Sequence, residues 1–435
     1  MKEIKIGVHQ VTRVEGHGNI IVNAKDGKVE EVRWEIPESP RFFEAMLRGR
    51  KYDDVAPIAS RICGICGVGH TLTSLEATED AFGIKPSEQT VLLRKLLSNG
   101  ATLQSHVLHY YFLVAPDFLG VGSVFPLAST HKDVVLRALR LKKLSNDLCD
   151  LIGGRTVHPI SAVVNGFTKL PTADELRAMQ KRLRDALADL DATVELFKTF
   201  QIPDLVRETE FIALKHPDEY AFLYGDVSST DTGTTPRENY LQVTNEYCVP
   251  HSTAKHAKHV RDAYMVGALA RFNNSPAQLS PLAKRAAEEL GLRATCHNPF
   301  MNSVAQLVES FHVIEDSLTI IDQLLTRGIK EEDRSVKVRA GRGVGACEVP
   351  RGILFHDYTY NDEGIITEAN CVIPTDQNHA NIQKDMEAFL PLILDKPQDE
   401  IKHVLEMLVR AYDPCISCSA HLLEVKFKDH CKSTA

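Results

Sequence analysis

Residues 61–70 read RICGICGVGH, in which two cysteines stand in a C-x-x-C spacing and a histidine follows four residues after the second cysteine. Residues 413–421 read DPCISCSAH and repeat the pattern near the other end of the chain, with the histidine three residues after the second cysteine. A C-x-x-C pair on one loop or helix start can place two thiolates on one metal ion. If both pairs bind the same ion, the fold must bring the two ends of the chain together.

The spacing of these cysteines alone leaves several interpretations open. A redox-active pair is typical of a βαβ context, which the surrounding sequence does not show. Structural zinc sites usually combine two pairs separated by roughly 12–20 residues, whereas these pairs are separated by nearly the whole chain. The spacing therefore favours a catalytic site for a soft metal over a zinc site or unrelated core cysteines.

The composition excludes other classes of protein. Of the 435 residues, 43% are hydrophobic and 25% are charged, which is typical of a globular protein whose core needs no disulfides. A net charge of −8 is unfavourable for non-specific nucleic-acid binding, which requires a basic surface. No apolar run reaches the roughly 18 residues of a membrane helix. Ten cysteines without a visible secretory signal predict a reducing, cytoplasmic location.

Hydrophobic periodicity predicts strands near both ends of the chain. Apolar residues alternate with polar ones at residues 4–8 and 20–22, and Asp26-Gly27 is a strong hairpin signal. Residues 336–374 return to strand character, with a second hairpin turn at residues 361–364. Residues 341–346, GRGVGA, fit G-x-G-x-x-A, but a β-rich run follows where a dinucleotide site requires a helix. We therefore predict no nucleotide site there.

The middle of the chain is predicted to be helical. Thr172 and Glu175 form a capping box before an amphipathic stretch that ends near Phe200. Residues 302–327 form another such stretch, ended by Gly328, and residues 399–411 form a third. The fold class is therefore mostly α with small β elements (α+β). We predict a single domain over residues 1–435, with N-terminal strands at 1–37, a helical core at 41–335, a β-rich segment at 336–375, C-terminal helices and the metal loop at 380–421, and a removable tail at 422–435.

Together, R-x-C-G-x-C-x-x-x-H and D-P-C-x-x-C-x-x-H resemble the signature of the large, catalytic subunit of [NiFe] hydrogenases, and the resemblance covers the whole chain. It implies a helical bundle with an N-terminal β-hairpin. It also implies reversible heterolytic cleavage of H2 at a nickel–iron centre, whose iron carries carbon monoxide and cyanide supplied by maturation machinery. Cys63 and Cys415 match terminal nickel ligands, and Cys66 and Cys418 match ligands that bridge nickel and iron.

The resemblance also implies roles for residues around these cysteines. Glu15, in the R-x-E-G-H stretch, matches the carboxylate that takes a proton from the Cys415 thiolate. Arg351 matches an arginine that lies over the metals and donates to a cyanide nitrogen. Its role implies a set of supporting residues: Asp117 and Asp413 orient the arginine, Pro374 and Thr375 hold the second cyanide with the Thr375 hydroxyl as donor, and His70 forms a hydrogen bond near a bridging sulfur.

A second, hard metal ion is implied as well. Glu44, His421 and the backbone carbonyl of Cys371 match its ligands, and the ion would be magnesium or iron(II). In most of the family a maturation protease cuts after the histidine that corresponds to His421, so residues 422–435 are predicted to be removed.

The chain has no ferredoxin-type cysteine run, so electrons are expected to leave through iron–sulfur clusters of a hydrogenase small subunit. The resemblance is greatest to the cytoplasmic bidirectional branch. Its flavin and iron–sulfur (diaphorase-type) subunits pass electrons to NAD(P), the deazaflavin F420, ferredoxin or heterodisulfide. The sequence does not identify the acceptor. The alternatives are a non-catalytic scaffold stapled by zinc, a regulatory H2-sensing subunit, and a cysteine-free relative of respiratory complexes, which the four cysteines disfavour.

Overall fold

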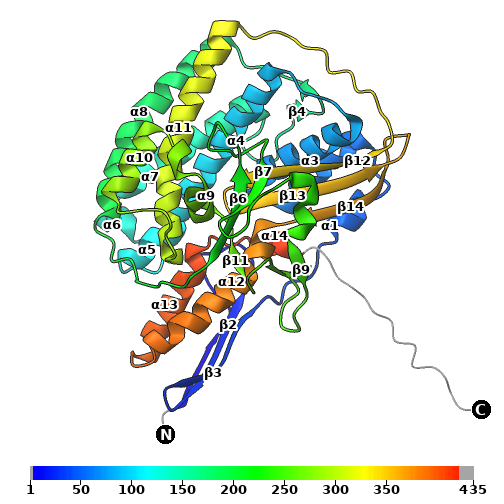
Figure 1. Cartoon of the computed structure of the whole chain (residues 1–435). Coiled ribbons are helices and arrows are strands. Elements are labelled where there is room, and N and C mark those ends of the chain that lie inside the picture. The colour runs from blue at the N-terminus through cyan, green and yellow to red at the C-terminus, as the bar shows by residue number, and fades with distance from the viewer. Residues whose placement is uncertain (1–2, 421–435) are drawn as a thin grey trace, which may run out of the picture.

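The computed structural model describes residues 3–420, and the structural statements below refer to these residues. The predicted ligand His421 and the predicted tail therefore lie outside the described residues. The molecule is mostly helical with small sheets, as predicted (Figure 1). The helices of at least five residues are α1 (Phe43–Leu47), α2 (Tyr52–Ala59), α3 (Gly67–Phe82), α4 (Glu88–Leu108), α7 (Lys132–Gly153), α8 (Ala173–Phe197), α9 (Ala268–Asn274), α10 (Pro281–Glu289), α11 (Asn302–Arg327), α12 (Pro374–Phe389) and α13 (Gln398–Ala411).

The N-terminal strands form an antiparallel sheet in the order β1-β2-β3. Its strands are β1 (Glu3–Val8), β2 (Asn19–Lys25) and β3 (Lys28–Glu35), so the hairpin predicted at Asp26-Gly27 is confirmed. Both turn residues have positive φ angles, as a two-residue hairpin turn requires. The alternating apolar residues predicted for these strands face the core, where Trp34 is completely buried.

The long helices pack side by side as a bundle (Figure 1). Helix α4 lies against α7 and α11, and α11 also contacts α8 and α10. The capping box predicted before α8 is present, with Thr172 and Glu175 exchanging hydrogen bonds. Helix α11 ends before Gly328, as predicted. No helix within residues 3–420 is long and apolar enough to cross a membrane.

Smaller sheets and short helices connect the bundle to the C-terminal half. The short helices are α5 (Ala115–Phe118), α6 (Leu127–Thr130) and α14 (Ile416–Ser419). The remaining strands are β4 (Ala162–Val163), β5 (Gly166–Phe167), β6 (Glu210–Lys215), β7 (Asp226–Ser229), β8 (Gly233–Thr235), β9 (Asn245–Tyr247), β10 (His256–Lys258), β11 (Tyr264–Met265), β12 (Gly341–Val349), β13 (Gly352–Tyr360) and β14 (Ile366–Val372). The second predicted hairpin is therefore confirmed as the connection of β13 and β14, whereas the predicted segment boundaries stay predictions.

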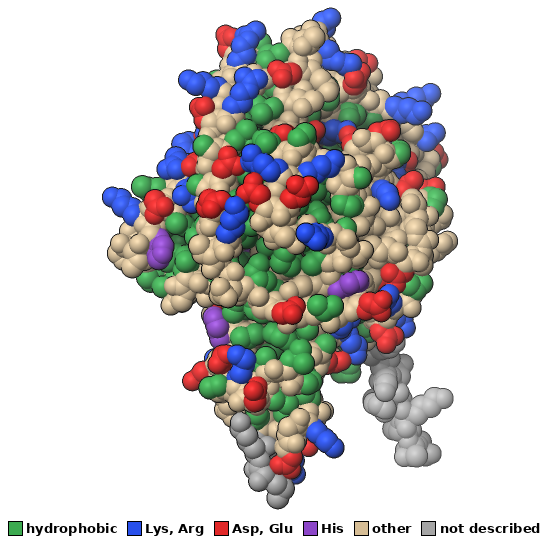
Figure 2. Space-filling view, turned by 60° about the vertical axis from the view of Figure 1, so that its left-hand side comes forward, with side chains coloured by type: hydrophobic (Ala, Val, Ile, Leu, Met, Phe, Trp, Pro, Cys, Tyr) green, Lys and Arg blue, Asp and Glu red, His purple; other side chains and the backbone are tan. Residues whose placement is uncertain are grey.

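The surface carries charges of both signs. Figure 2 shows lysine, arginine, aspartate and glutamate side chains interspersed on one face, with apolar side chains between them. Some of these charges pair across neighbouring helices, as Arg140 of α7 does with Asp189 of α8.

The glycine repeat of residues 341–345 lies in strand β12, not at the start of a helix, as the sequence predicted. Its glycines face helix α3, and the two elements are in backbone contact. A Cβ atom on Gly345 would overlap the carbonyl oxygen of Thr73, and one on Gly341 would lie 2.6 Å from the carbonyl oxygen of Ala81. Because α3 begins directly after Cys66 and β12 leads into Arg351, this packing fixes the separation of those two residues.

Gly345→Ala should destabilise the protein by about 1–3 kcal/mol, because the added methyl group has no space against the α3 backbone. Urea denaturation of the full chain measures the change. Gly122→Ala is the matched control, since nothing lies within 4 Å of a Cβ atom at Gly122. Equal midpoints for both variants would show that β12 can move away from α3 at little cost.

Candidate metal centre

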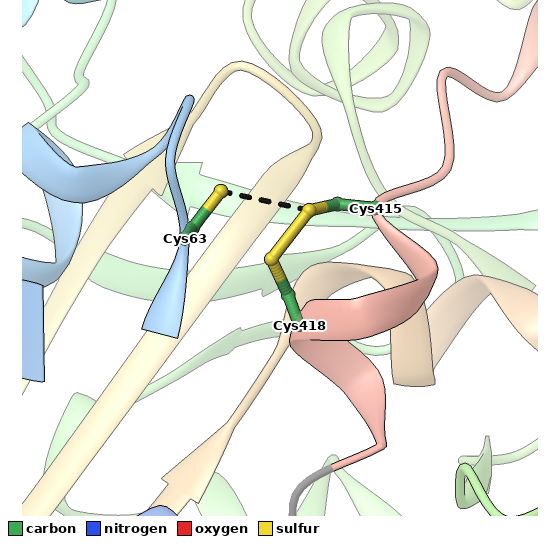
Figure 3. A group of neighbouring side chains, drawn as sticks. All are labelled: Cys63, Cys415 and Cys418. Atoms are coloured by element: carbon green, nitrogen blue, oxygen red, sulfur yellow. Dashed lines mark hydrogen bonds between the residues drawn. A yellow bond between two sulfur atoms is a disulfide. The ribbon is translucent and has the colours of Figure 1, made fainter. Parts of the chain in front are cut away.

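The structure brings cysteines from both ends of the chain together in the buried interior (Figure 3). The sulfur atoms of Cys63, Cys415 and Cys418 all lie within 4.8 Å of one another. The Sγ atoms of Cys63 and Cys415 are 3.5 Å apart, although these residues are separated by 352 positions in the sequence. Within residues 3–420, this is the only group of three or more histidine, cysteine or acidic side chains with metal-binding geometry.

Two observations bear on the predicted set of four thiolate ligands. Cys415 and Cys418 are joined by a disulfide, so all four cysteines can act as thiolates only when this bond is reduced. Cys66 lies beside the group of three, where its backbone N–H donates to the Sγ of Cys63 at 2.9 Å.

Hydrogen bonding separates the acidities of the first pair. A hydrogen bond from Cys66 lowers the pKa of Cys63 to about 7 despite burial, and the charge of Arg351 lowers it further. The same hydrogen bond raises the pKa of Cys66, and burial adds to that effect. Cys63 is therefore the more readily ionised thiol of the pair.

Arg351 lies beside the cysteines, almost fully buried. Its Nη2 donates to Oδ1 of Asp413 at 2.7 Å, and its Nε donates to the Asp413 carbonyl oxygen at 2.5 Å. Asp413 has a φ of 52°, a left-handed conformation that turns both its carbonyl and its carboxylate toward the guanidinium. The remaining nitrogen, Nη1, lies 3.4 Å from the Sγ of Cys66 and 3.4 Å from the hydroxyl of Ser105. The structure thus places Asp413 on Arg351, where the sequence predicted it.

Asp117 requires a correction, because it does not orient Arg351. Its carboxylate accepts two hydrogen bonds from Arg410, at 2.8 and 2.9 Å, and a further one from Arg13. The residue that touches Arg351 in its place is Ser105, which the sequence analysis missed. Nothing in the sequence around Ser105 distinguishes it from the other small polar residues of α4.

A second missed contact supports Asp413 from behind. Gln306 of α11 donates to Oδ2 of Asp413 at 3.3 Å, and its side-chain oxygen bonds to Nδ1 of His109 at 2.5 Å. The other ring nitrogen of His109 bonds to the carbonyl oxygen of Arg410 at 2.7 Å. His109 begins a π-helical turn after α4, a distortion that is frequent at functional sites.

Glu15 connects the N-terminal stretch directly to the C-terminal cysteine loop. Its Oε2 lies 3.2 Å from the Sγ of Cys415 and accepts a hydrogen bond from the backbone N–H of Ser417 at 3.1 Å. Its carbonyl oxygen accepts a hydrogen bond from the N–H of Ile416 at 2.9 Å. The carboxylate is therefore held on the sulfur that the sequence paired with it.

Thr375 lies at the start of α12, after Pro374, and is buried. Its hydroxyl oxygen accepts a hydrogen bond from the N–H of Cys415 at 3.0 Å. The hydroxyl hydrogen is not used in that bond, so it can donate to another group near Cys415.

The second predicted metal site is described only in part. Glu44 and Cys371 are both buried, and burial followed by the nearby charge of Glu44 raises the pKa of the Cys371 thiol. Nδ1 of His70 lies 3.0 Å from Nε2 of His356, so the described partner of His70 is a histidine and not a sulfur atom.

Comparisons with known proteins agree with this geometry. A family described as nickel-dependent hydrogenase matches residues 41–135 and 252–421, and one described as HoxL-like matches residues 5–39. The alpha subunit of sulfhydrogenase 1 from Pyrococcus furiosus is 36% identical over 97% of this chain and 99% of its own length. One subunit of the F420-non-reducing hydrogenase from Methanothermobacter thermautotrophicus is 32% identical over 98% and 96%. A crystal structure of an NAD+-reducing [NiFe]-hydrogenase has a TM-score of 0.86 and 27% identity over 96% and 99%.

Asp117→Ala should lower the free energy of unfolding by about 3–5 kcal/mol, because it leaves the buried Arg410 without its carboxylate partner. Chemical denaturation of the full chain measures the loss. Asp133→Ala serves as the control, because Asp133 is exposed in its pair with Arg137 and its removal should change stability by about 0.5 kcal/mol or less. Similar losses in both variants would contradict the structural role of Asp117.

Proposed function

The chain belongs to the nickel-dependent hydrogenase family as a [NiFe] hydrogenase large subunit, and on that premise we propose that Cys63, Cys66, Cys415 and Cys418 hold its nickel–iron centre. The observation that carries this assignment is the meeting of both C-x-x-C pairs in one buried site. Cys63 and Cys415 are the terminal nickel ligands, and Cys66 and Cys418 bridge nickel and iron.

The chemistry of these donors fits a nickel–iron centre. Thiolates are soft ligands that suit nickel, and burial keeps water from them. The cationic Arg351 offsets part of their negative charge and keeps donor groups on the same side. When bound, the centre polarises H2 and accepts its electrons, with iron carrying carbon monoxide and cyanide. Arg351 and the Thr375 hydroxyl donate to the two cyanides, with Pro374 shaping the second position.

Glu15 is proposed to act as the general base of the reaction. Its carboxylate lies at hydrogen-bond distance from the Cys415 sulfur, so a proton on that sulfur can pass to Oε2 without any rearrangement. The N–H of Ser417 holds the same oxygen and favours its ionised form. Arg351 acts without changing its own protonation, because Asp413 and the nearby thiols raise its pKa despite burial.

We further propose a structural magnesium or iron(II) ion held by Glu44, the carbonyl oxygen of Cys371 and His421. Cleavage by a maturation protease after His421 would remove residues 422–435. Electrons pass to the iron–sulfur clusters of a small subunit, then through further subunits to a cytoplasmic acceptor. The similarity to an NAD+-reducing enzyme favours NAD(P) as that acceptor.

Glu15→Gln should abolish H2 oxidation and proton–deuterium exchange while nickel content stays unchanged, because glutamine cannot take up the proton. Gas consumption and isotope exchange by the purified complex measure the effect. Glu30→Gln, on an exposed position of the N-terminal sheet, should have no effect. A Glu15→Gln enzyme with normal exchange would exclude Glu15 as the proton acceptor.

Arg351→Lys should lower H2 oxidation by about 100-fold or more with the metals retained, because an ammonium group cannot reproduce the planar donors held by Asp413. The rate per nickel atom is the quantity to compare with the wild type. Loss of nickel from this variant would instead assign Arg351 a structural role.

A further inference from the structure

Arg41 lies between the two cysteine loops and binds both of them. Its Nη1 donates to the carbonyl oxygen of Ile62 at 2.8 Å and to that of Ser417 at 3.1 Å. These carbonyls belong to the residues immediately before Cys63 and Cys418. Nη2 donates to the carbonyl oxygen of Arg61 at 2.9 Å, and the backbone N–H of Arg41 donates to that of Ala420 at 2.7 Å. One residue thus binds the backbone on both sides of the site.

The chemistry of arginine explains why this position requires it. Residues 60–62 form a short 3-10 helix, and the carbonyls at a helix end have no partner within the helix. A guanidinium offers five N–H donors in a fixed plane, so it can satisfy carbonyls on two loops at once, whereas a lysine ammonium cannot reproduce that fork. The ring of Phe43 lies 4.8 Å from the guanidinium carbon and supports its plane.

The backbone next to Arg41 is also unusual. Phe42 has a φ of 55°, a left-handed conformation that bulky residues rarely adopt. Such conformations persist only where the surrounding contacts hold them, and they concentrate at functional sites. Here the contacts come from Arg41 itself, whose backbone and side chain are both fixed to the cysteine loops.

We propose that Arg41 is a positioning residue that sets the spacing of the two C-x-x-C loops, so that one nickel–iron centre can be held by both. It acts through the carbonyls of Ile62 and Ser417 and does not touch the reacting atoms. This inference rests on the proposed function, because it concerns the same four cysteines. Without the arginine fork, the C-terminal loop keeps its contacts with Glu15 and Thr375 but loses its direct link to the Cys63 loop.

The test compares Arg41→Lys with wild type in the purified, matured hydrogenase complex. Nickel per large subunit is measured by mass spectrometry, and backbone hydrogen exchange is followed in peptides from residues 412–420. We expect a severalfold loss of nickel, because disturbing residues that position metal ligands typically lowers metal affinity by about 10–100-fold. Exchange at 412–420 should rise while exchange in α8 stays unchanged. Arg50→Lys is the control on the same segment, since Arg50 donates only to the carbonyl oxygen of Met46.

Three outcomes separate the possibilities. Unchanged nickel and unchanged exchange at 412–420 in Arg41→Lys would overturn the role of Arg41 while leaving the metal centre intact. Nickel loss together with faster exchange throughout the chain would also overturn it, because it would show a general loss of stability. Wild-type complex without nickel would overturn the proposed function itself. If Arg41→Lys is not recovered as a complex, Arg41→Gln, which keeps a planar donor, enters the same comparison.

Discussion

The contact between the two ends of the chain is the constraint on which the rest of the structure depends. Closing a loop of 352 residues costs conformational entropy, and two sulfur atoms alone cannot offset it. Backbone contacts share this cost, because Ile416 donates to the carbonyl of Glu15 and Arg41 donates to that of Ala420. The site is therefore built where the N-terminal sheet, the start of α12 and the C-terminal loop meet (Figure 1).

Charge is buried around this contact only in paired form. Arg351 is bound by Asp413, and Asp117 is shared by Arg13 and Arg410. Behind them, Arg271 pairs with Glu309 and Glu348 and donates to the carbonyl of Pro350, the residue before Arg351. A buried ion pair adds little net stability, but removing one partner is costly, so these networks hold the arginine in one geometry. The glycine face of β12 on α3 completes the frame from the other side.

Much of this arrangement could be predicted from the sequence, because it depends on local pattern. The hairpin at Asp26-Gly27, the capped helix α8 and helix α11 follow from periodicity and capping residues. The motif spacing identified the cysteines, and the strand context correctly separated residues 341–346 from a nucleotide site. The partners of buried charges could not be predicted, because they depend on how distant elements approach. Asp117 was therefore given to the wrong arginine, and Ser105, Arg41 and Gln306 were missed.

An infrared spectrum of the purified native complex, in the region where carbon monoxide and cyanide absorb, tests most directly whether the cysteines hold a nickel–iron centre. We predict one carbonyl and two cyanide bands that shift when H2 is added. The sample must carry a processed C-terminus and its small subunit, so that maturation is complete. Absence of these bands from such a sample would mean that the four cysteines hold another metal, such as zinc, or none.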